Sequence, residues 1–259
     1  MPMRVDETVV IDENKKINDK YYKLSFNSVR LARHVKPGQF MQVKITPVSD
    51  PFLRRPFSYF RTEGDRVEML YEVLGRGTHI LSQRKAGMKI QVMGPLGKAF
   101  TPKVRGRRRV LVAGGVGVPP LVFLAEKTKA DYLLIGTKSK AEVLPKRELS
   151  QVKAEVRYAT NDGSYGKKGF VTALLEELIL EIGASKLFIQ TCGPTVMMNA
   201  VMEMARRFDV PGEASMEENM ACGVGTCLGC MIRTREGWMT CCTEGPVFNF
   251  NRLCHHEKH

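Results

Sequence analysis

Two kinds of hydrophobic pattern divide the chain. Up to about residue 103, the apolar residues fall in short segments separated by Gly, Pro and Asp turns, which is typical of β-strands. We predict strands in the segments 29–35, 39–47, 66–74 and 89–94. The spacing of these strands favours a small antiparallel barrel.

From about residue 107, strand and helix patterns alternate. Continuous apolar runs predict buried strands at 108–114, 132–137, 154–160 and 186–192. Apolar residues spaced three and four apart predict helices at 122–130, 169–183 and 194–208. Such alternation implies a parallel sheet with crossover helices. After 210–214 the periodicity gives way to a segment rich in glycine and cysteine. We therefore expect three domains, 1–103, 104–211 and 212–259.

Composition narrows the class of protein. The 259 residues are 43% hydrophobic and 26% charged, which is ordinary for a globular chain. Six of the seven cysteines lie between 222 and 254, a crowding unlike a secreted disulfide framework. The N-terminus shows no signal peptide, and the longest mainly apolar run, 110–125, is too short to span a membrane. We expect a cytoplasmic protein without a membrane partner.

The formal charge of +13 would suit phosphate-bearing cofactors or an acidic partner protein, and charge alone does not choose between them. Nucleic acid is not predicted, because the basic residues are dispersed and aromatics are not interleaved with them. The tightest cluster comprises Arg105, Arg107, Arg108 and Arg109, just before the strand pattern. We interpret it as a solvated turn.

The most specific motif is a run of four cysteines, Cys222, Cys227, Cys230 and Cys242. Their spacing, C-x4-C-x2-C-x11-C, is the plant-type ligand pattern of a [2Fe–2S] cluster. Glycines between the first three let the backbone wrap closely around the metal. Structural zinc and unliganded thiols are the alternatives; zinc sites usually pair two C-x2-C hooks, and only Cys227 and Cys230 form one. Cys241 adjoins Cys242, so spacing alone leaves the fourth ligand open.

Three turns in the first part of the chain suit a flavin nucleotide. The segment 54–58, R-R-P-F-S, combines arginines for a pyrophosphate with a serine hydroxyl for a flavin edge. The segment 75–78, G-R-G-T, precedes a helix pattern and could accept a second phosphate. The segment 94–97, G-P-L-G, is a stiff turn. Taken alone, R-P-x-S is better interpreted as a surface turn, and G-P-L-G would otherwise be interpreted as a hairpin loop.

Two turns in the second part suit a dinucleotide. The segment 114–120, G-G-V-G-V-P-P, follows a strand and opens a helix, the context that a pyrophosphate site requires. Pro120 replaces the third glycine of the Rossmann fingerprint, and the prolines suit a first helical turn. Cys192-Gly193-Pro194 also ends a strand before a helix, although Cys192 could equally be a small buried residue.

In this order, R-P-F-S, G-x-G-T, G-P-L-G-x-x-F, G-G-V-G-V-P-P and C-G-P-x-x-M resemble the ferredoxin–NADP reductase superfamily. With the cysteine run followed by T-E-G-P-V-F, the chain resembles the electron-transfer subunits of type B dihydroorotate dehydrogenase over essentially its whole length. The resemblance implies an antiparallel Greek-key flavin barrel in 1–103, a parallel-sheet α/β nicotinamide-nucleotide domain in 104–211 and a small [2Fe–2S] module in 212–259.

The resemblance also implies a site residue set. FAD would be bound by Arg55, Pro56, Phe57, Ser58, Leu70, Tyr71, Glu72, Gly77 and Thr78. NAD, as substrate, would meet Gly114, Gly115, Gly117, Pro119, Asp162, Cys192, Gly193, Pro194 and Met197. The cluster would be held by Cys222, Cys227, Cys230 and Cys242, the last preferred over Cys241 because two residues separate the family's ligand from G-P-V-F. Cys254 has no counterpart and is expected to be a tail thiol.

The resemblance implies a redox enzyme subunit without a catalytic acid or base. A flavin stands between NAD, which exchanges hydride, and a cluster that takes one electron. The partner would be an FMN-containing dihydroorotate dehydrogenase catalytic subunit, in a heterotetramer of two of each, serving pyrimidine biosynthesis. The alternatives are a diaphorase subunit of a soluble hydrogenase or of a ferredoxin–NADP transhydrogenase, whose pattern replaces the first cysteine by aspartate, and a non-catalytic redox-sensing or zinc-binding module.

Overall fold

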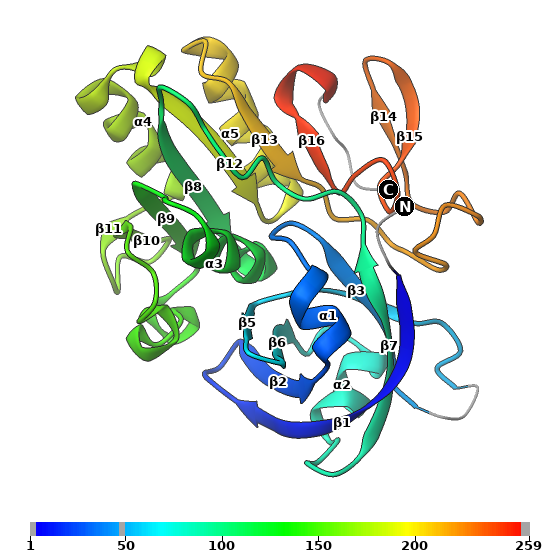
Figure 1. Cartoon of the computed structure of the whole chain (residues 1–259). Helices are drawn as coiled ribbons and strands as arrows, with labels where there is room; N and C mark the ends of the chain where they lie inside the picture. The colour runs from blue at the N-terminus through cyan, green and yellow to red at the C-terminus, as the bar shows by residue number, and fades with distance from the viewer. Residues whose placement is uncertain (1–3, 47–49, 255–259) are drawn as a thin grey trace.

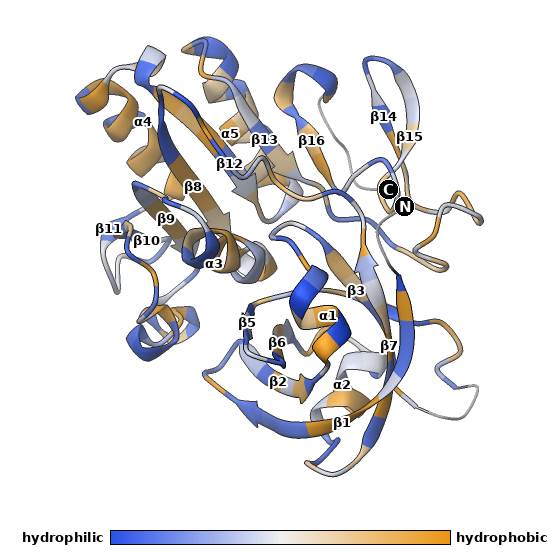
Figure 2. Cartoon of the chain, in the orientation of Figure 1, coloured by the Kyte–Doolittle hydropathy of each residue, from blue (hydrophilic) through white to orange (hydrophobic). Residues whose placement is uncertain are grey.

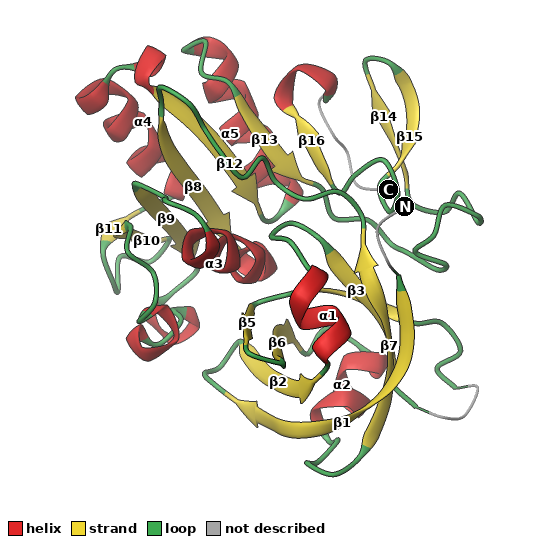
Figure 3. Ribbon diagram, viewed as in Figure 1, coloured by secondary structure: helices red, strands yellow, loops and turns green. Residues whose placement is uncertain are grey.

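The computed structural model describes residues 4–46 and 50–254 (Figure 1). Residue 47, at the end of one predicted strand, and the histidine-rich tail 255–259 lie outside this part. The described chain forms two seven-stranded sheets and a small two-stranded one. The first large sheet lies in the N-terminal part and the second in the C-terminal part of the chain, and the glycine–cysteine segment lies beside both (Figures 1 and 3).

The first sheet is antiparallel throughout and curls into a barrel. Its order is β4-β3-β7-β1-β2-β6-β5. The strands are β1 (Val5–Lys16), β2 (Tyr21–Asn27), β3 (Phe40–Lys44), β4 (Arg55–Ser58), β5 (Arg61–Glu63), β6 (Arg66–Glu72) and β7 (Lys89–Leu96). Two short helices, α1 (Val29–His34) and α2 (Arg76–Ser82), pack against it. The antiparallel barrel expected from the sequence is confirmed.

The second sheet is parallel except at one edge. Its order is β11-β10-β9-β8-β12-β13-β16, and only β16 runs antiparallel to its neighbour, β13. The strands are β8 (Arg108–Gly114), β9 (Tyr132–Thr137), β10 (Glu155–Thr160), β11 (Lys167–Lys168), β12 (Leu187–Cys192), β13 (Gly212–Ser215) and β16 (Val247–Asn249). This confirms the α/β fold class. The glycine–cysteine segment leaves the sheet after β13 and returns to it at β16.

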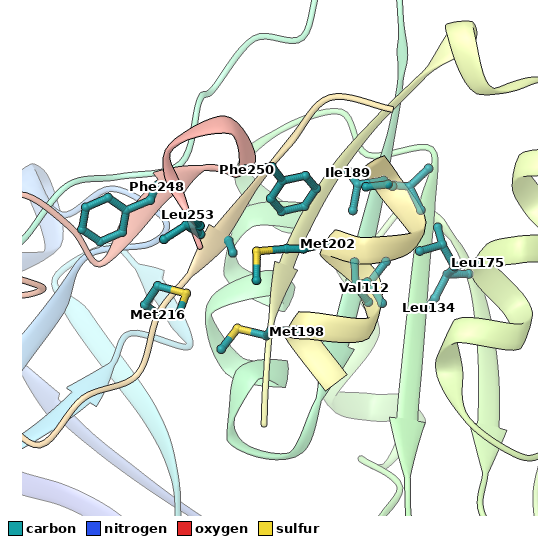
Figure 4. Packing of buried hydrophobic residues seen from close by; sticks show 14 of the residues in the cluster. Val112, Leu134, Leu175, Ile189, Met198, Met202, Met216, Phe248, Phe250 and Leu253 are labelled. Atoms are coloured by element: carbon teal, nitrogen blue, oxygen red, sulfur yellow. The ribbon is translucent and has the colours of Figure 1, made fainter. Parts of the chain in front are cut away.

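Helices cover both faces of the second sheet, because its strands are apolar on both sides. On β8, Leu111 faces α3 (Val118–Lys127), whereas Val112 faces α4 (Val171–Ile182) and α5 (Thr195–Arg207). Figure 4 shows Met198 and Met202 of α5 in the same buried cluster as Phe248 of β16 and Phe250, which follows that strand. The apolar colour of Figure 2 accordingly runs along the inner faces of these helices and along the strands.

The glycine–cysteine segment contains one hairpin, β14 (Met231–Thr234) and β15 (Gly237–Thr240). Single-turn 3-10 helices complete the described chain, at Gly115–Gly117, Lys140–Glu142, Lys146–Leu149, Ala184–Lys186 and Phe250–Arg252. None of the helices in the described ranges is long and apolar enough to cross a membrane.

Three sequence predictions were wrong in detail. The segment 29–35 is mostly helical, because Ser28 accepts the Leu31 N–H at 3.1 Å and caps α1. The G-P-L-G segment is mostly strand, since Phe40 of β3 pairs with Leu96 and holds it extended. Arg109 is not in a solvated turn: it is 2% exposed, and its guanidinium donates to the carbonyl groups of residues 101 and 102.

Buried ion pairs join the barrel to the α/β sheet. Arg61 of β5 binds Glu126 of α3, with Nη2–Oε1 at 2.5 Å and Nε–Oε2 at 3.0 Å. Lys23 of β2 binds Glu148 at 2.7 Å. These side chains are at most 11% exposed. The contacts fix the two sheets against each other, and both pockets described below include residues from both parts of the chain.

Candidate redox site

The first pocket opens between the barrel and the α/β sheet and has a volume of about 290 Å³. Eight of the nine residues expected to bind FAD line it: Arg55, Pro56, Phe57, Ser58, Leu70, Tyr71, Glu72 and Thr78. The ninth, Gly77, lies behind the pocket, where an added Cβ would be 3.0 Å from Arg55 Nε. Residues from β4, β6 and α2 meet here because β4 and β6 contact each other across the barrel.

The two arginines of the R-R-P-F-S turn are separated. Arg54 makes a bidentate ion pair with Asp6 of β1, at 2.9 and 3.0 Å. Arg55 instead lines the pocket, and its Nη1 donates to the Leu53 carbonyl at 2.7 Å. Only Arg55 of this pair is therefore placed to contact a pyrophosphate in the pocket.

An aromatic wall shapes the pocket. The rings of Phe57 and Tyr71 meet edge to face, with centroids 5.9 Å apart. The Tyr71 hydroxyl donates to Asn14 Oδ1 at 2.9 Å, and burial raises its pKa well above the ordinary value. The opposite wall comes from the other sheet and includes Cys192, whose thiol pKa is also raised by burial. A flat, mostly apolar ring with polar edges fits between these walls.

The second pocket, of about 400 Å³, lies at the carboxyl edge of the parallel sheet, where ligands of open α/β sheets bind. Four residues expected to meet NAD line it: Gly114, Gly115, Pro194 and Met197. Of the others, Pro119 is buried in α3 and Cys192 faces the first pocket. Gly117 and Gly193 form the packed base, where a Cβ on Gly117 would be 2.1 Å from the Cys192 carbonyl oxygen.

Asp162 does not line either pocket. Its carboxylate accepts hydrogen bonds from the Ser164 hydroxyl at 2.6 Å and the Ser164 N–H at 2.9 Å, and these bonds lower its pKa. The preceding residue, Asn161, lines the nucleotide pocket instead. The turn at 161–164 therefore lies at the nucleotide pocket, but Asn161 and not Asp162 lines it.

Sequence reasoning missed Lys20, which comes from the turn between β1 and β2. Its ammonium lies 3.1 Å from Glu142, which lines the nucleotide pocket, and 3.5 Å from Glu72, which lines the flavin pocket. Lys20 itself lines the nucleotide pocket. No sequence signal marks it, because its partners are 52 and 122 positions away.

Two exposed apolar side chains were also missed. Phe170, at the start of α4, is 70% exposed, and Val196, in the first turn of α5, is 83% exposed. Both line the nucleotide pocket. Exposed apolar groups at the rim of a pocket are typical of a site that receives a flat ring.

The cysteines of the metal motif form two pairs. The Cys222 sulfur accepts the N–H groups of Val224 and Cys227, each at 3.4 Å. Burial raises the pKa of the Cys222 thiol, but these N–H bonds outweigh burial and lower it to about 6. In the second pair, the Cys230 sulfur accepts the Cys242 N–H at 3.4 Å.

Cys241 points in another direction. Its thiol donates to the Met216 carbonyl at 3.4 Å, it is fully buried, and burial raises its pKa. The Cys242 thiol instead hydrogen-bonds to Cys230, and burial together with this bond raises the pKa of Cys242 to about 12. The geometry therefore favours Cys242 as the fourth ligand.

The thiols fit a two-iron group. A [2Fe–2S] group needs four thiolates, two on each iron, with N–H donors to the sulfurs. The Cys222–Cys227 and Cys230–Cys242 pairs contain four thiols, and the N–H groups of Cys227 and Cys242 are donors to sulfur.

Comparison with known proteins identifies the family. Residues 217–254 match the iron–sulfur cluster binding domain of dihydroorotate dehydrogenase B. The chain is 38% identical to the dihydroorotate dehydrogenase B (NAD(+)) electron transfer subunit of Desulforamulus reducens, over 88% of this chain and 90% of the relative. It is 38% identical to the subunit of the same name from Clostridium acetobutylicum, over 91% and 92%. The chain belongs to this family.

A solved structure resembles the electron-transfer subunit fold closely. It is that of an NADH-dependent reduced ferredoxin–NADP oxidoreductase, described for flavin-based electron bifurcation. The TM-score is 0.82 at 26% identity, over 95% of this chain and 89% of the other. The family resemblance drawn from the ordered motifs is thus confirmed, as is the fold class.

Proposed function

We propose that the chain passes electrons between NAD and a separate dihydroorotate dehydrogenase subunit. A flavin bound in the first pocket would exchange hydride with NAD and single electrons with the cluster. The chain's own residues position the two nucleotides and the cluster: Arg55 and Ser58 for FAD, the Gly114–Gly115 turn and Pro194 for NAD, and the four paired cysteines for iron. No side chain is assigned as an acid or base.

One observation carries the proposal. Residues 215–220 line the flavin pocket, and Cys222 follows only two positions later. The Gly97 backbone of the barrel also packs on Pro246, where an added Cβ would be 2.4 Å from Pro246 Cδ. The flavin pocket and the cysteine loop are therefore built from one continuous wall, which suits short-range electron transfer between them.

The proposal extends to the partner. The family name supports a catalytic partner subunit. We infer that this subunit contains FMN and that the assembly holds two of each subunit. The chain should be purified with and without such a subunit, and NAD+ reduction by dihydroorotate followed at 340 nm. We expect turnover only with both present, and flavin and iron–sulfur absorption in this chain alone. A colourless, zinc-loaded chain would contradict the proposal.

We infer a preference for NAD over NADP from the family, whose relatives are named for NAD(+). The nucleotide pocket contains the Glu142 carboxylate, which forms an ion pair with Lys20 and would repel a 2′-phosphate. Lys138 also lines the pocket and could attract that phosphate. Comparing NADH with NADPH oxidation, with ferricyanide as acceptor, tests the preference.

A transhydrogenase-type diaphorase is the second candidate. The TM-score of 0.82 to the ferredoxin–NADP oxidoreductase favours it. Cys222 stands where the transhydrogenase pattern has aspartate, which favours the dihydroorotate dehydrogenase reading. Reduction of NADP+ by reduced ferredoxin, with no dihydroorotate activity in the paired complex, would support this second candidate.

A further inference from the structure

Gln42 of β3 is a buried amide that lacks hydrogen-bond partners. It is 0% exposed, and neither its Oε1 nor its Nε2 makes a hydrogen bond within the described chain. A buried amide without partners destabilises a protein, so such groups are rare and need an explanation. The four other buried amide and guanidinium side chains of the described chain are better satisfied. Gln39 uses both of its polar atoms, and Gln190, Arg109 and Arg61 each use at least one nitrogen.

The Gln42 amide lies against the cysteine loop. A Cβ added to Gly223 would be 2.7 Å from Gln42 Cγ and 3.0 Å from Gln42 Nε2. Gly223 has a φ of +70° and follows Cys222 directly. The same loop directs the N–H groups of Val224 and Cys227 at the Cys222 sulfur. Gln42, on the barrel, therefore lies against the cysteine loop, in which the N–H groups of Val224 and Cys227 already donate to the Cys222 sulfur.

Strand β3 also reaches the flavin pocket. Phe40, two positions before Gln42, lines that pocket, and Gln42 itself pairs with Pro56 of the flavin-binding turn. A β-bulge between Phe40 and Gln42 changes the register against β7. The strand thus has one contact with the flavin pocket and one with the cysteine loop.

We propose that the Gln42 amide donates a hydrogen bond to a sulfur of the [2Fe–2S] group held at Cys222. The inference rests on the proposed cluster and adds a tuning residue to it. Sulfur is the acceptor that would satisfy Nε2 at this place, since the neighbouring loop leaves it no oxygen partner. A donor to sulfur stabilises the more negative, reduced cluster and so raises its reduction potential.

The test compares Gln42→Met and Gln42→Leu with the wild-type holo chain. Both variants keep the side-chain bulk and remove the N–H donor. We expect the one-electron reduction equilibrium of the cluster to fall about tenfold, which is about 59 mV, in a titration followed by electron paramagnetic resonance. Gln39→Met is the matched control, because Gln39 is also buried but donates to the Gly97 carbonyl at 2.8 Å. Its cluster potential should stay unchanged.

A direct signature comes from the wild-type chain. With glutamine labelled by 15N at the side chain, pulsed electron paramagnetic resonance of the reduced cluster should show a nitrogen coupling that Gln42→Met lacks. No coupling in the wild type, an unshifted cluster potential in the variants, an equal shift in Gln39→Met, or a shift of the FAD potential alone would each overturn the inference. A wild-type chain without any cluster signal would instead contradict the proposed function.

Discussion

The ion pair between Arg61 and Glu126 should be a main determinant of how the barrel is held on the α/β sheet. The Arg61 side chain is 10% exposed and that of Glu126 is 3% exposed, so neither charge is well solvated. Arg61→Met leaves the Glu126 carboxylate buried without its bidentate partner. Removing one partner of such a pair costs about 3–5 kcal/mol of unfolding free energy. For a chain of this size the change lowers the melting temperature by roughly 6–20 °C.

The assay is thermal and urea unfolding of the FAD-loaded chain, followed by flavin fluorescence and circular dichroism. The double variant Arg61→Met/Glu126→Leu should recover part of the loss, because it removes the unpaired Glu126 charge. Glu68, which also lies 3.5 Å from Arg61, keeps its ion pair with Arg66. Lys16→Met is the control: its ion pair with Asp19 is exposed, at 54% and 74%, so its loss should cost at most about 1 kcal/mol. A loss below about 1 kcal/mol in Arg61→Met would refute the reasoning.

Three further predictions concern the pockets and the cysteines. Cys242→Ser should abolish the cluster absorption and leave FAD bound, whereas Cys241→Ser should retain the cluster; the reverse result would make Cys241 the ligand. Lys20→Met should raise KM for NADH several-fold more than it lowers kcat in a ferricyanide assay, and an unchanged KM would remove Lys20 from the nucleotide site. Gly117→Ala should cost more than about 2 kcal/mol in urea unfolding, since its Cβ would meet the Cys192 carbonyl at 2.1 Å, and a neutral change would contradict that close approach.

Local sequence patterns predicted the α/β part well. The strand before Gly114 and the helix after it lie where the apolar run and the two prolines placed them. These elements have strong periodicity and defined ends, and their apolar faces are buried on both sides of one sheet. The same holds for α5, whose pattern predicted the helix at 194–208 within one residue at each end.

The barrel was harder to predict, because distant contacts decide its strands. The sequence predictions omitted β1 and β2, where charged residues interrupt the apolar alternation. Lys23 of β2 is 8% exposed because Glu148, 125 positions later, neutralises it. Gln42 is a similar case. Its sequence context is that of an ordinary strand, but the loop that packs on its side chain begins at Cys222, 180 positions later. No local pattern records such partners.

The pairing of β16 with β13 determines what would remain of the sheet if the cysteine-containing segment between these strands were shortened. Ser215 of β13 and Val247 of β16 are paired in antiparallel register, so residues 216–246 form one long connection between two adjacent strands. The entropic cost of closing a loop grows only with the logarithm of its length, so the two ends can meet whether the connection is long or short. A shortened chain could therefore keep the Ser215–Val247 sheet edge, but it would lose residues 216–220 from the wall of the flavin pocket together with the cysteine ligands.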